Sequence, residues 1–126
     1  MSEEKKQLGS IVWTDLTIPN ATEVKDFYKS VIGWDSQDFS LGDYNDYVVC
    51  NEGTENAVAG ICHAKGSNAN IPPVWLVYVS VANVEESVAK VKALGGEVLE
   101  GPRLMDGNNF AIIKDPAGAI MAIIEN

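Results

Sequence analysis

The chain has 126 residues and a formal net charge of −9 at pH 7. This length is typical of one compact domain whose core needs no disulfide or metal to hold it together. The negative charge repels phosphate backbones and anionic membranes, and no basic patch offsets it, so nucleic acid and membrane surfaces are poor partners. No apolar run approaches the roughly 20 residues of a membrane span, and the charged start Met1–Gln7 does not resemble a signal peptide. We therefore expect a cytoplasmic protein.

The acids and the cysteines of the chain are unevenly placed. Six acids and no Lys or Arg lie between Asp35 and Glu55. Such an acid-rich stretch is typical of a solvated hairpin edge, and it could also attract cationic ligands. Cys50 and Cys62 form no CxxC motif, and we interpret them as reduced thiols.

The first half of the chain predicts a strand, a helix and three further strands. Ser10–Ile18 alternates in polarity as a strand does, and Asn20 can cap the helix that follows. Gly33 is well suited to end that helix. Its apolar residues recur at i, i+3, i+4 and i+7, namely Val24, Phe27, Tyr28 and Val31. The three later strands are expected at Asp35–Ser40, Tyr44–Asn51 and Ala57–His63.

The second half predicts the same order of elements after a linker, Ala64–Pro73, which is rich in Gly, Ser, Asn and Pro. Val74–Val81 is expected to be a strand, and Asn83 caps a helix that Gly95-Gly96 closes. The buried stripe of this helix is expected at Val84, Val88, Val91 and Leu94. Strands follow at Glu97–Glu100, Asn109–Lys114 and Ala119–Glu125, with turns at Gly101-Pro102 and Asp115–Gly118.

The two halves repeat each other with an offset of 63 residues. A two-copy repeat of this length predicts two half-domains that pair around a pseudo-twofold axis, so that both copies line any site on that axis. We expect one domain over residues 1–126, with module one at 8–63, the linker at 64–73 and module two at 74–126. The linker is long enough for the modules to pair within one chain or exchange between two. The offset superimposes Ile11 on Val74, Leu16 on Val79, Asn20 on Asn83 and Gly33 on Gly96.

Several motifs of the chain resemble the vicinal oxygen chelate superfamily. They are Val12-Trp13-Thr14-Asp15-Leu16, Phe27-Tyr28, Ile32-Gly33-Trp34 and Lys114-Asp115-Pro116-Ala117-Gly118. The superfamily includes glyoxalase I, extradiol dioxygenases and bleomycin resistance proteins. The resemblance implies an α+β fold in which two βαβββ modules form a curved, barrel-like mixed sheet. It implies little about the reaction, because one scaffold hosts many chemistries.

The resemblance also implies where a metal would be bound. In the metalloenzymes of this superfamily, His or Glu on the first and last strands of each module bind a divalent ion. These four positions fall on Trp13, Gly60, Leu76 and Ala122, none of which offers a donor atom. His63 is the only histidine, and strand alternation from Gly60 places it on the other sheet face. We therefore predict neither a metal nor another cofactor.

The same strand positions predict a cavity for a small molecule. Asp15 and Tyr78 are related by the repeat. Each lies two residues after one of the four positions that would bind the metal, so its side chain points to the same side of its strand. Either could act as a catalytic acid or base if burial shifted its pKa. The expected ligand-binding residues are Trp13, Asp15, Gly60, Leu76, Tyr78 and Ala122, and Thr17, Val58, Ser80 and Ile120 are expected on the same concave side. Alternatively, the large side chains simply fill the concavity.

Three functions remain open from the sequence. The chain could be a metal-free binding protein for a small apolar or aromatic molecule, neutral or cationic, as antibiotic-sequestering relatives are. It could be an enzyme, either a cofactor-independent isomerase or lyase that uses Asp15, or a glyoxalase or dioxygenase relative with a metal site elsewhere. It could also be an interaction module with a filled, purely structural concavity. We favour the binding protein, and we expect a homodimer because two-module relatives commonly dimerise.

Overall fold

The computed structural model describes residues 7–125, which divide into two compact units. One unit contains Thr14–Trp75, and the other contains Trp13 and the residues before it together with the chain from Leu76 onward. The division falls inside the first strand. Most of the segment Met1–Gln7, which we expect not to be a signal peptide, and Asn126, the last residue of the predicted second module, lie outside the described residues 7–125.

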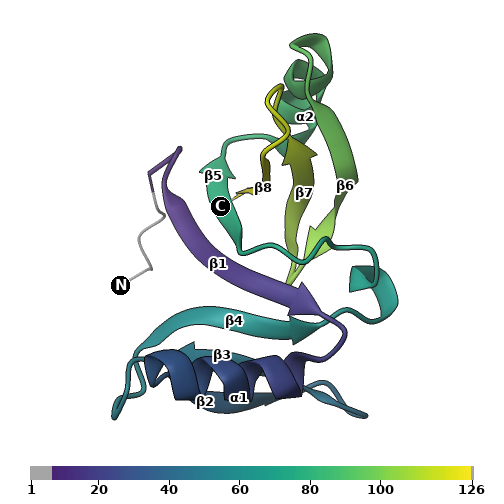
Figure 1. Ribbon diagram of the computed structural model, residues 1–126. Coiled ribbons are helices and arrows are strands. Elements are labelled where there is room, and N and C mark those ends of the chain that lie inside the picture. The colour runs from purple at the N-terminus through teal and green to yellow at the C-terminus, as the bar shows by residue number, and fades with distance from the viewer. Residues whose placement is uncertain (1–6, 126) are drawn as a thin grey trace. The chain divides into compact units, whose positions relative to one another are not determined.

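The elements follow the order that the sequence predicts (Figure 1). The first module contains β1 (Ile11–Ile18), α1 (Ala21–Ile32), β2 (Asp35–Ser40), β3 (Asn45–Cys50) and β4 (Ala57–His63). The second contains β5 (Leu76–Val81), α2 (Val84–Ala93), β6 (Glu97–Met105), β7 (Asn108–Lys114) and β8 (Ile120–Glu125). A short 3-10 helix, Gly66–Asn68, lies in the predicted linker. The α+β class with two βαβββ modules is therefore confirmed.

The strands hydrogen-bond in the order β2-β3-β4-β1-β5-β8-β7-β6. The pairs β1–β4 and β5–β8 are parallel, whereas β2–β3, β3–β4, β6–β7 and β7–β8 are antiparallel, so the sheet is mixed. Each module thus joins its first strand to its last by a parallel pairing. Among the described residues, no helix is long and apolar enough to cross a membrane.

In the unit Thr14–Trp75, α1 packs on one face of the sheet. Ala21 of the helix is completely buried against Leu16, Val49 and Ile61, and Tyr28 packs at the margin of this core. Because side chains alternate along a strand, Asp15 and its neighbours of the same parity lie on the opposite face. The predicted site residues of this unit, Asp15 and Gly60, therefore lie on the sheet face opposite α1.

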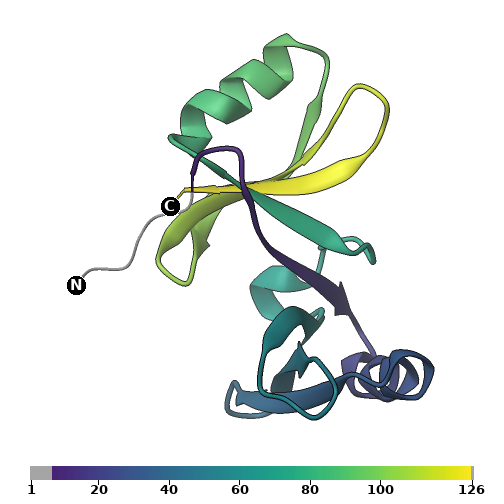
Figure 2. The same cartoon turned by 90° about the vertical axis from the view of Figure 1, so that its left-hand side faces the viewer.

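In the other unit, α2 lies across one face of strands β5–β8 (Figure 2). Val84 and Val88 of α2 pack against Ala111 and Ile123, and all four are buried. The opposite face carries a second set of buried residues, since Ile112 pairs with Ala122 and Ala122 with Tyr78. The sheet of this unit is therefore buried on both faces.

The ends of the two helices differ from each other more than their sequences suggest. Asn83 caps α2 as predicted, because its side chain accepts a hydrogen bond of 2.9 Å from the backbone N–H of Glu86. Asn20 precedes α1 but accepts no such bond. Gly33 ends α1 in the left-handed conformation, as predicted. The prediction of a buried Leu94 is wrong, because α2 ends one residue earlier and Leu94 is 75% exposed.

The predicted turn at Gly101-Pro102 is also wrong, because β6 continues through both residues to Met105. The register with β7 shifts between Val98 and Glu100 and again between Glu100 and Arg103. Gly101 has a φ of 83°, which an L side chain rarely adopts and which a bulge requires. Pro102 is tolerated because β6 is an edge strand, where a missing N–H removes no ladder bond.

Candidate functional site

The predicted site residues occupy β1, β4, β5 and β8, and the strand register brings four of them together in pairs. Asp15 lies opposite Gly60 in the parallel ladder of β1 and β4. Tyr78 lies opposite Ala122 in the parallel ladder of β5 and β8. Residues paired in this way project from the same face of the sheet. The two pairs therefore hold equivalent places in the two modules, on the faces opposite α1 and α2.

Burial separates Trp13 from the other predicted site residues. Asp15 is 8% exposed, Tyr78 is 2% exposed and Trp13 is 36% exposed, while Leu76 and Ala122 are essentially inaccessible. Asp15 and Tyr78 both have interaction partners in the structure. A shared space lined by all six predicted residues remains a prediction.

Two residues considered in the sequence lie on the faces that α1 covers. The placement of Val58 on the ligand face is wrong, because Val58 packs against the core cluster beside α1. The cause is a register shift between Val49 and Cys50, which breaks the simple alternation at this end of β4. His63 lies in register with Ile18, away from the face of Gly60, as alternation predicts.

The surroundings of His63 are aromatic and acidic. Its Nδ1 lies 3.5 Å from Oδ1 of Asp46, which also accepts a hydrogen bond of 2.8 Å from the backbone N–H of His63. The ring of Tyr44 meets the imidazole edge-on at 5.3 Å. Within residues 7–125, no group of three or more His, Cys, Asp or Glu side chains could hold a metal ion. The donor set of the superfamily's metalloenzymes does not fit Trp13, Gly60, Leu76 and Ala122, whose side chains supply no ligand.

Sequence reasoning missed three residues on the sheet face that carries Tyr78 in the second module. The ring of Phe110 stacks on Tyr78, with centroids 6.3 Å apart and planes at 30°. The guanidinium of Arg103 lies 4.7 Å from the centroid of Phe110, on that ring's face. Its Nε donates a hydrogen bond of 2.8 Å to Oε2 of Glu100. Strand parity within Asn109–Lys114 could have indicated Phe110, but the mistaken turn at Gly101-Pro102 concealed Glu100 and Arg103.

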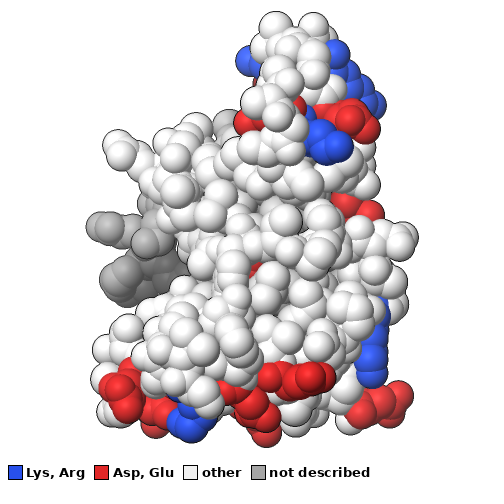
Figure 3. Space-filling model, viewed as in Figure 1, with Lys and Arg blue, Asp and Glu red and all other residues white. Residues whose placement is uncertain are grey.

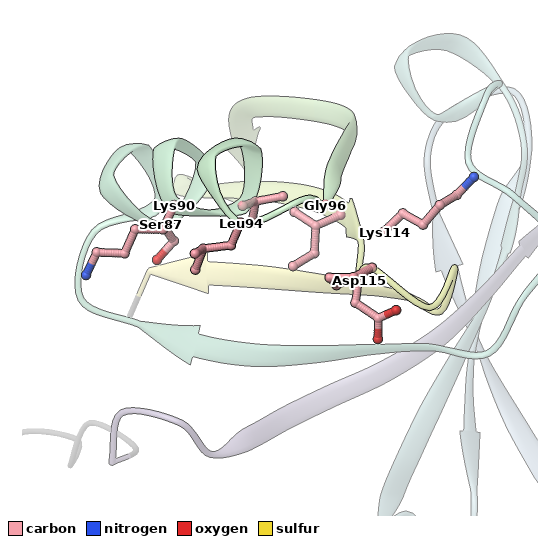
Figure 4. A pocket seen from close by; sticks show the side chains of 9 residues that line it. Ser87, Lys90, Leu94, Gly96, Lys114 and Asp115 are labelled. Carbon is pink, nitrogen blue, oxygen red and sulfur yellow. The ribbon is translucent and has the colours of Figure 1, made fainter.

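A pocket of about 290 Å³ lies elsewhere, between α2 and the end of β7 (Figure 4). Figure 4 shows Lys90 and Lys114 extending from opposite ends of it. None of the predicted site residues lines this pocket, which is on the helix-covered side of the sheet. Its lining comprises Ser87, Lys90, Val91, Leu94, Gly96, Ile113, Lys114, Asp115 and Pro116.

The acid-rich stretch belongs to the unit Thr14–Trp75, where Figure 3 shows red side chains gathered near α1 and β2. Asp35 at its start is paired internally. Its Oδ1 lies 2.8 Å from Nζ of Lys29, and its Oδ2 accepts a hydrogen bond of 2.7 Å from the backbone N–H of Gly53. The hydrogen bonds from Lys29 and Gly53 and the lysine charge lower the pKa of the Asp35 carboxyl. This part of the stretch thus stabilises a hairpin edge.

Comparison with known proteins agrees with this architecture. "Putative glyoxylase CFP32" of Mycobacterium tuberculosis is 27% identical over 120 residues, which cover 94% of this chain and 45% of CFP32. "Anthracycline biosynthesis protein DnrV" of Streptomyces peucetius is 26% identical over 127 residues, which cover 91% of this chain and 46% of DnrV. The chain therefore spans about half the length of the curated relatives it matches.

A solved structure shares the fold over almost the whole chain. A variant of methylmalonyl-CoA epimerase from Streptomyces coelicolor, in complex with 2-nitronate-propionyl-CoA, superimposes with a TM-score of 0.55 at 14% sequence identity. The match covers 95% of this chain and 99% of the epimerase. Residues 10–123 also match the family model described as Glyoxalase/Bleomycin resistance protein/Dioxygenase superfamily. The chain belongs to the glyoxalase/bleomycin resistance protein/dioxygenase superfamily.

Proposed function

We propose that this chain is a metal-free binding protein for a small apolar or aromatic molecule. The observation that carries the proposal is the pairing of Asp15 with Gly60 and of Tyr78 with Ala122 at equivalent places in the two modules. These are the strands on which metalloenzymes of the superfamily place their ligands. Here the same strands present a ring, a carboxyl group and small apolar residues.

The chemistry of the face supports an apolar or aromatic ligand. Leu76 and Ala122 are apolar, and the ring of Tyr78 stacks on that of Phe110 with 30° between their planes. Most small-molecule sites combine such apolar surfaces with a few polar groups that fix the orientation of the ligand. The name of DnrV connects that relative with anthracycline biosynthesis, and the epimerase structure contains a CoA ester. Both are consistent with a small organic ligand here.

Tryptophan fluorescence and thermal unfolding in metal-free buffer test the proposal. Trp34 and Trp75 lie 5.7 Å apart in a separate aromatic cluster, so replacing both with Phe leaves Trp13 as the sole reporter. A panel of neutral, cationic and anionic aromatic compounds should contain members that quench Trp13 and raise the melting temperature. If no compound changes the fluorescence or the melting temperature, the result would contradict the proposal. It would favour the alternative that the large side chains fill the concavity, which is consistent with the full burial of Tyr78 and Phe110.

An enzymatic function is the second candidate. Asp15 is a buried carboxyl residue on the ligand face, beside Gly60, and burial is the usual way to bring a carboxyl pKa towards that of a general base. A cofactor-independent isomerase or lyase would use it to remove a proton from the substrate. Asp15→Asn should then abolish turnover of a substrate that the variant still binds. Equal turnover by the variant would eliminate this role.

We further propose that the two modules form one domain and that the protein is a cytoplasmic homodimer. Apolar side chains exposed on α1 support the proposal of a dimer, because they offer a surface that a second copy of the chain could cover. Phe27, Val31 and Ile32 are 57%, 64% and 52% exposed. Exposed apolar groups of this extent commonly mark a contact with another protein. Sedimentation equilibrium should give twice the chain mass of 13.6 kDa, and Val31→Glu should lower it. A wild-type mass of 13.6 kDa at micromolar concentration would refute the dimer.

A further inference from the structure

The pocket between α2 and the end of β7 lies where the helix is no longer buried against the sheet. In the first half of α2, Val84 and Val88 are both buried in the core of this unit. In the second half, Val91 is only half-buried, and Leu94, which follows the helix, is 75% exposed. The cavity of about 290 Å³ lies beside this second half (Figure 4). It therefore gives a solute access to apolar side chains that the fold itself leaves uncovered.

The backbone around Gly96 fixes one wall of this pocket. The N–H of Gly96 donates a hydrogen bond of 2.8 Å to the carbonyl oxygen of Val91, so the chain turns back close to the end of α2. A Cβ on Gly96 would lie 2.8 Å from the backbone oxygen of Lys114 and 2.8 Å from Cγ1 of Val91. A larger residue would therefore clash, and this wall has no side chain. The other walls are mostly apolar and include Val91, Leu94, Ile113 and Pro116.

The charged groups at the pocket favour an anion. Figure 4 shows Lys90 and Lys114 at its opposite ends and the Asp115 carboxyl group turned away from α2. Asp115 is the one acid among the lining residues. Its Oδ1 accepts hydrogen bonds of 2.8 and 3.0 Å from the backbone N–H groups of Ala117 and Ala119. This carboxylate thus stabilises the turn after β7, and the lysines determine the charge that a ligand meets.

Lys90 is the more available of the two lysines. Nζ of Lys114 lies 3.8 Å from Oε1 of Glu97, so its charge is shared with an acid of the protein. Lys90 is exposed on α2, and in the described part of the chain it forms no ion pair. A lysine stem can lie along apolar surface while its ammonium stays in water. Lys90 can therefore turn towards an anion at the pocket without breaking an ion pair of its own.

We propose that this pocket binds a small amphipathic carboxylate, whose apolar part lies between Leu94 and Ile113 and whose carboxylate pairs with Lys90. The site shares no residue with the face proposed above for an apolar or aromatic ligand, and it does not depend on that function. Small-molecule pockets commonly measure roughly 300–1,000 Å³, so a cavity of about 290 Å³ suits a short apolar chain or a single ring. The protein's net charge of −9 repels anions at long range, and binding must rely on this local pair.

Three compounds with the same alkyl chain test the inference: octanoate, octanol and octylamine. Each is titrated into ¹⁵N-labelled wild type while the amide shifts of Leu94, Gly96 and Lys114 are followed. All three share the apolar part, so the difference between them reports the charge. Octanoate should bind about three- to fivefold more tightly than octanol or octylamine, which is the range expected for an exposed ion pair. Equal affinities, or tighter binding of octylamine, would overturn the inference.

Two lysines of α2 provide a matched pair of variants. Lys90 and Lys92 both lie in the last turn of the helix, where a positive charge complements the helix dipole, but only Lys90 lines the pocket. Lys90→Met should remove most of the preference for octanoate and leave octanol binding unchanged. Lys92→Met changes the net charge equally and should preserve the preference. Equal losses in the two variants would show a general charge effect and overturn the inference.

Ser87→Leu tests the cavity itself, because Ser87 lines it and a leucine there would fill it. This variant should lose the octanoate response and keep or raise the melting temperature. Leu94→Asn removes an exposed apolar wall and should weaken all three compounds with little change in stability. If Ser87→Leu instead halves the sedimentation mass and still binds octanoate as wild type does, the pocket is a contact between two copies and the inference is overturned.

The outcome is separable from that of the proposed function. An aromatic compound that quenches Trp13 should do so equally in wild type and in Ser87→Leu. Failure of octanoate to shift the pocket amides of wild type would overturn this inference and leave the proposed function standing. Octanoate shifts at Asp15 and Tyr78 in place of Leu94 and Lys114 would also overturn it.

Discussion

Asp15 and Gly60 lie opposite each other in the parallel ladder of β1 and β4, and Tyr78 and Ala122 repeat the relationship in β5 and β8. In each module the first strand contributes the larger side chain and the last strand contributes a glycine or an alanine. The sequence offset between Asp15 and Tyr78 is 63 residues, and that between Gly60 and Ala122 is 62. The internal repeat is therefore also a repeat of strand register.

The two helix N-termini allow a matched test of capping. Asn83→Ala should lower the free energy of unfolding by about 1 kcal/mol, because it removes the bond that the backbone N–H of Glu86 donates. Asn20→Ala should lower the free energy of unfolding by less, because the Asn20 side chain accepts no capping hydrogen bond. Its Nδ2 instead donates a long hydrogen bond of 3.4 Å to Oε1 of Glu23. Urea unfolding of both variants provides the comparison. Equal losses would show that the two caps are equivalent in solution.

The bulge in β6 predicts a strong dependence on Gly101. A Cβ at this position would lie 2.7 Å from the backbone oxygen of Phe110, and φ is 83°. Gly107 is a matched control, because it has the same φ of 83° and a Cβ added there would meet nothing within 4 Å. Gly107→Ala should lower the free energy of unfolding by about 1 kcal/mol from backbone strain alone, and Gly101→Ala by at least about 1 kcal/mol more. Thermal unfolding that ranks the variants in the reverse order would contradict the described path of β6.

The ion pair between Lys29 and Asp35 predicts a small, pH-dependent contribution to stability. The pKa of Asp35 is lowered from its ordinary value of 3.8 by the hydrogen bonds from Lys29 and Gly53 and by the lysine charge. A lowered carboxyl pKa stabilises the folded state above the ordinary value, and this contribution is lost as pH falls through the lowered pKa. Asp35→Asn should therefore lower stability slightly at pH 7 and have less effect at strongly acidic pH.

Denaturant unfolding of wild type and Asp35→Asn across this pH range measures the difference. The effect at pH 7 should be small because exposed ion pairs contribute little. Asp43→Asn, in the same acid-rich stretch, serves as a control for the change in net charge. A destabilisation by Asp35→Asn that grows towards acid would contradict the sign of the pKa shift.

The four vacated ligand positions predict that the protein holds no stoichiometric metal. Trp13, Gly60, Leu76 and Ala122 supply no donor, so dialysis against a mixture of divalent ions should leave well under one ion per chain. Elemental analysis after gel filtration gives the ratio. One tightly held Mn, Fe, Ni or Zn per chain would show that the chain binds metal through another set of residues.

The sequence predicts the elements well because each carries its own local signal. Helical and strand periods, caps and turn residues place both helices and the described strands close to their observed bounds, except for β6, which is predicted to end at Glu100 and continues to Met105. The errors occur where backbone irregularity replaces periodicity. Gly101-Pro102 has the composition of a turn but lies in a bulged edge strand, and Val58 has the parity of the ligand face but lies next to a register shift.

The candidate site is predictable only on the strands that the repeat relates. Counting along the repeat finds Asp15 and Tyr78, because equivalent strands preserve parity. Arg103 has no such counterpart, and its contact with Phe110 depends on a bulge that sequence patterns do not specify. Long-range contacts of this kind are determined by tertiary packing rather than by local propensity.

The most direct test of the proposed small-molecule site is chemical-shift mapping of ¹⁵N-labelled protein in metal-free buffer. The titrant is the aromatic compound that raises the melting temperature most. We predict that the largest amide shifts occur at Asp15, Gly60, Leu76, Tyr78 and Ala122. Shifts confined to the α2 pocket around Leu94 and Lys114, or a response that appears only after a divalent metal is added, would contradict the proposed site.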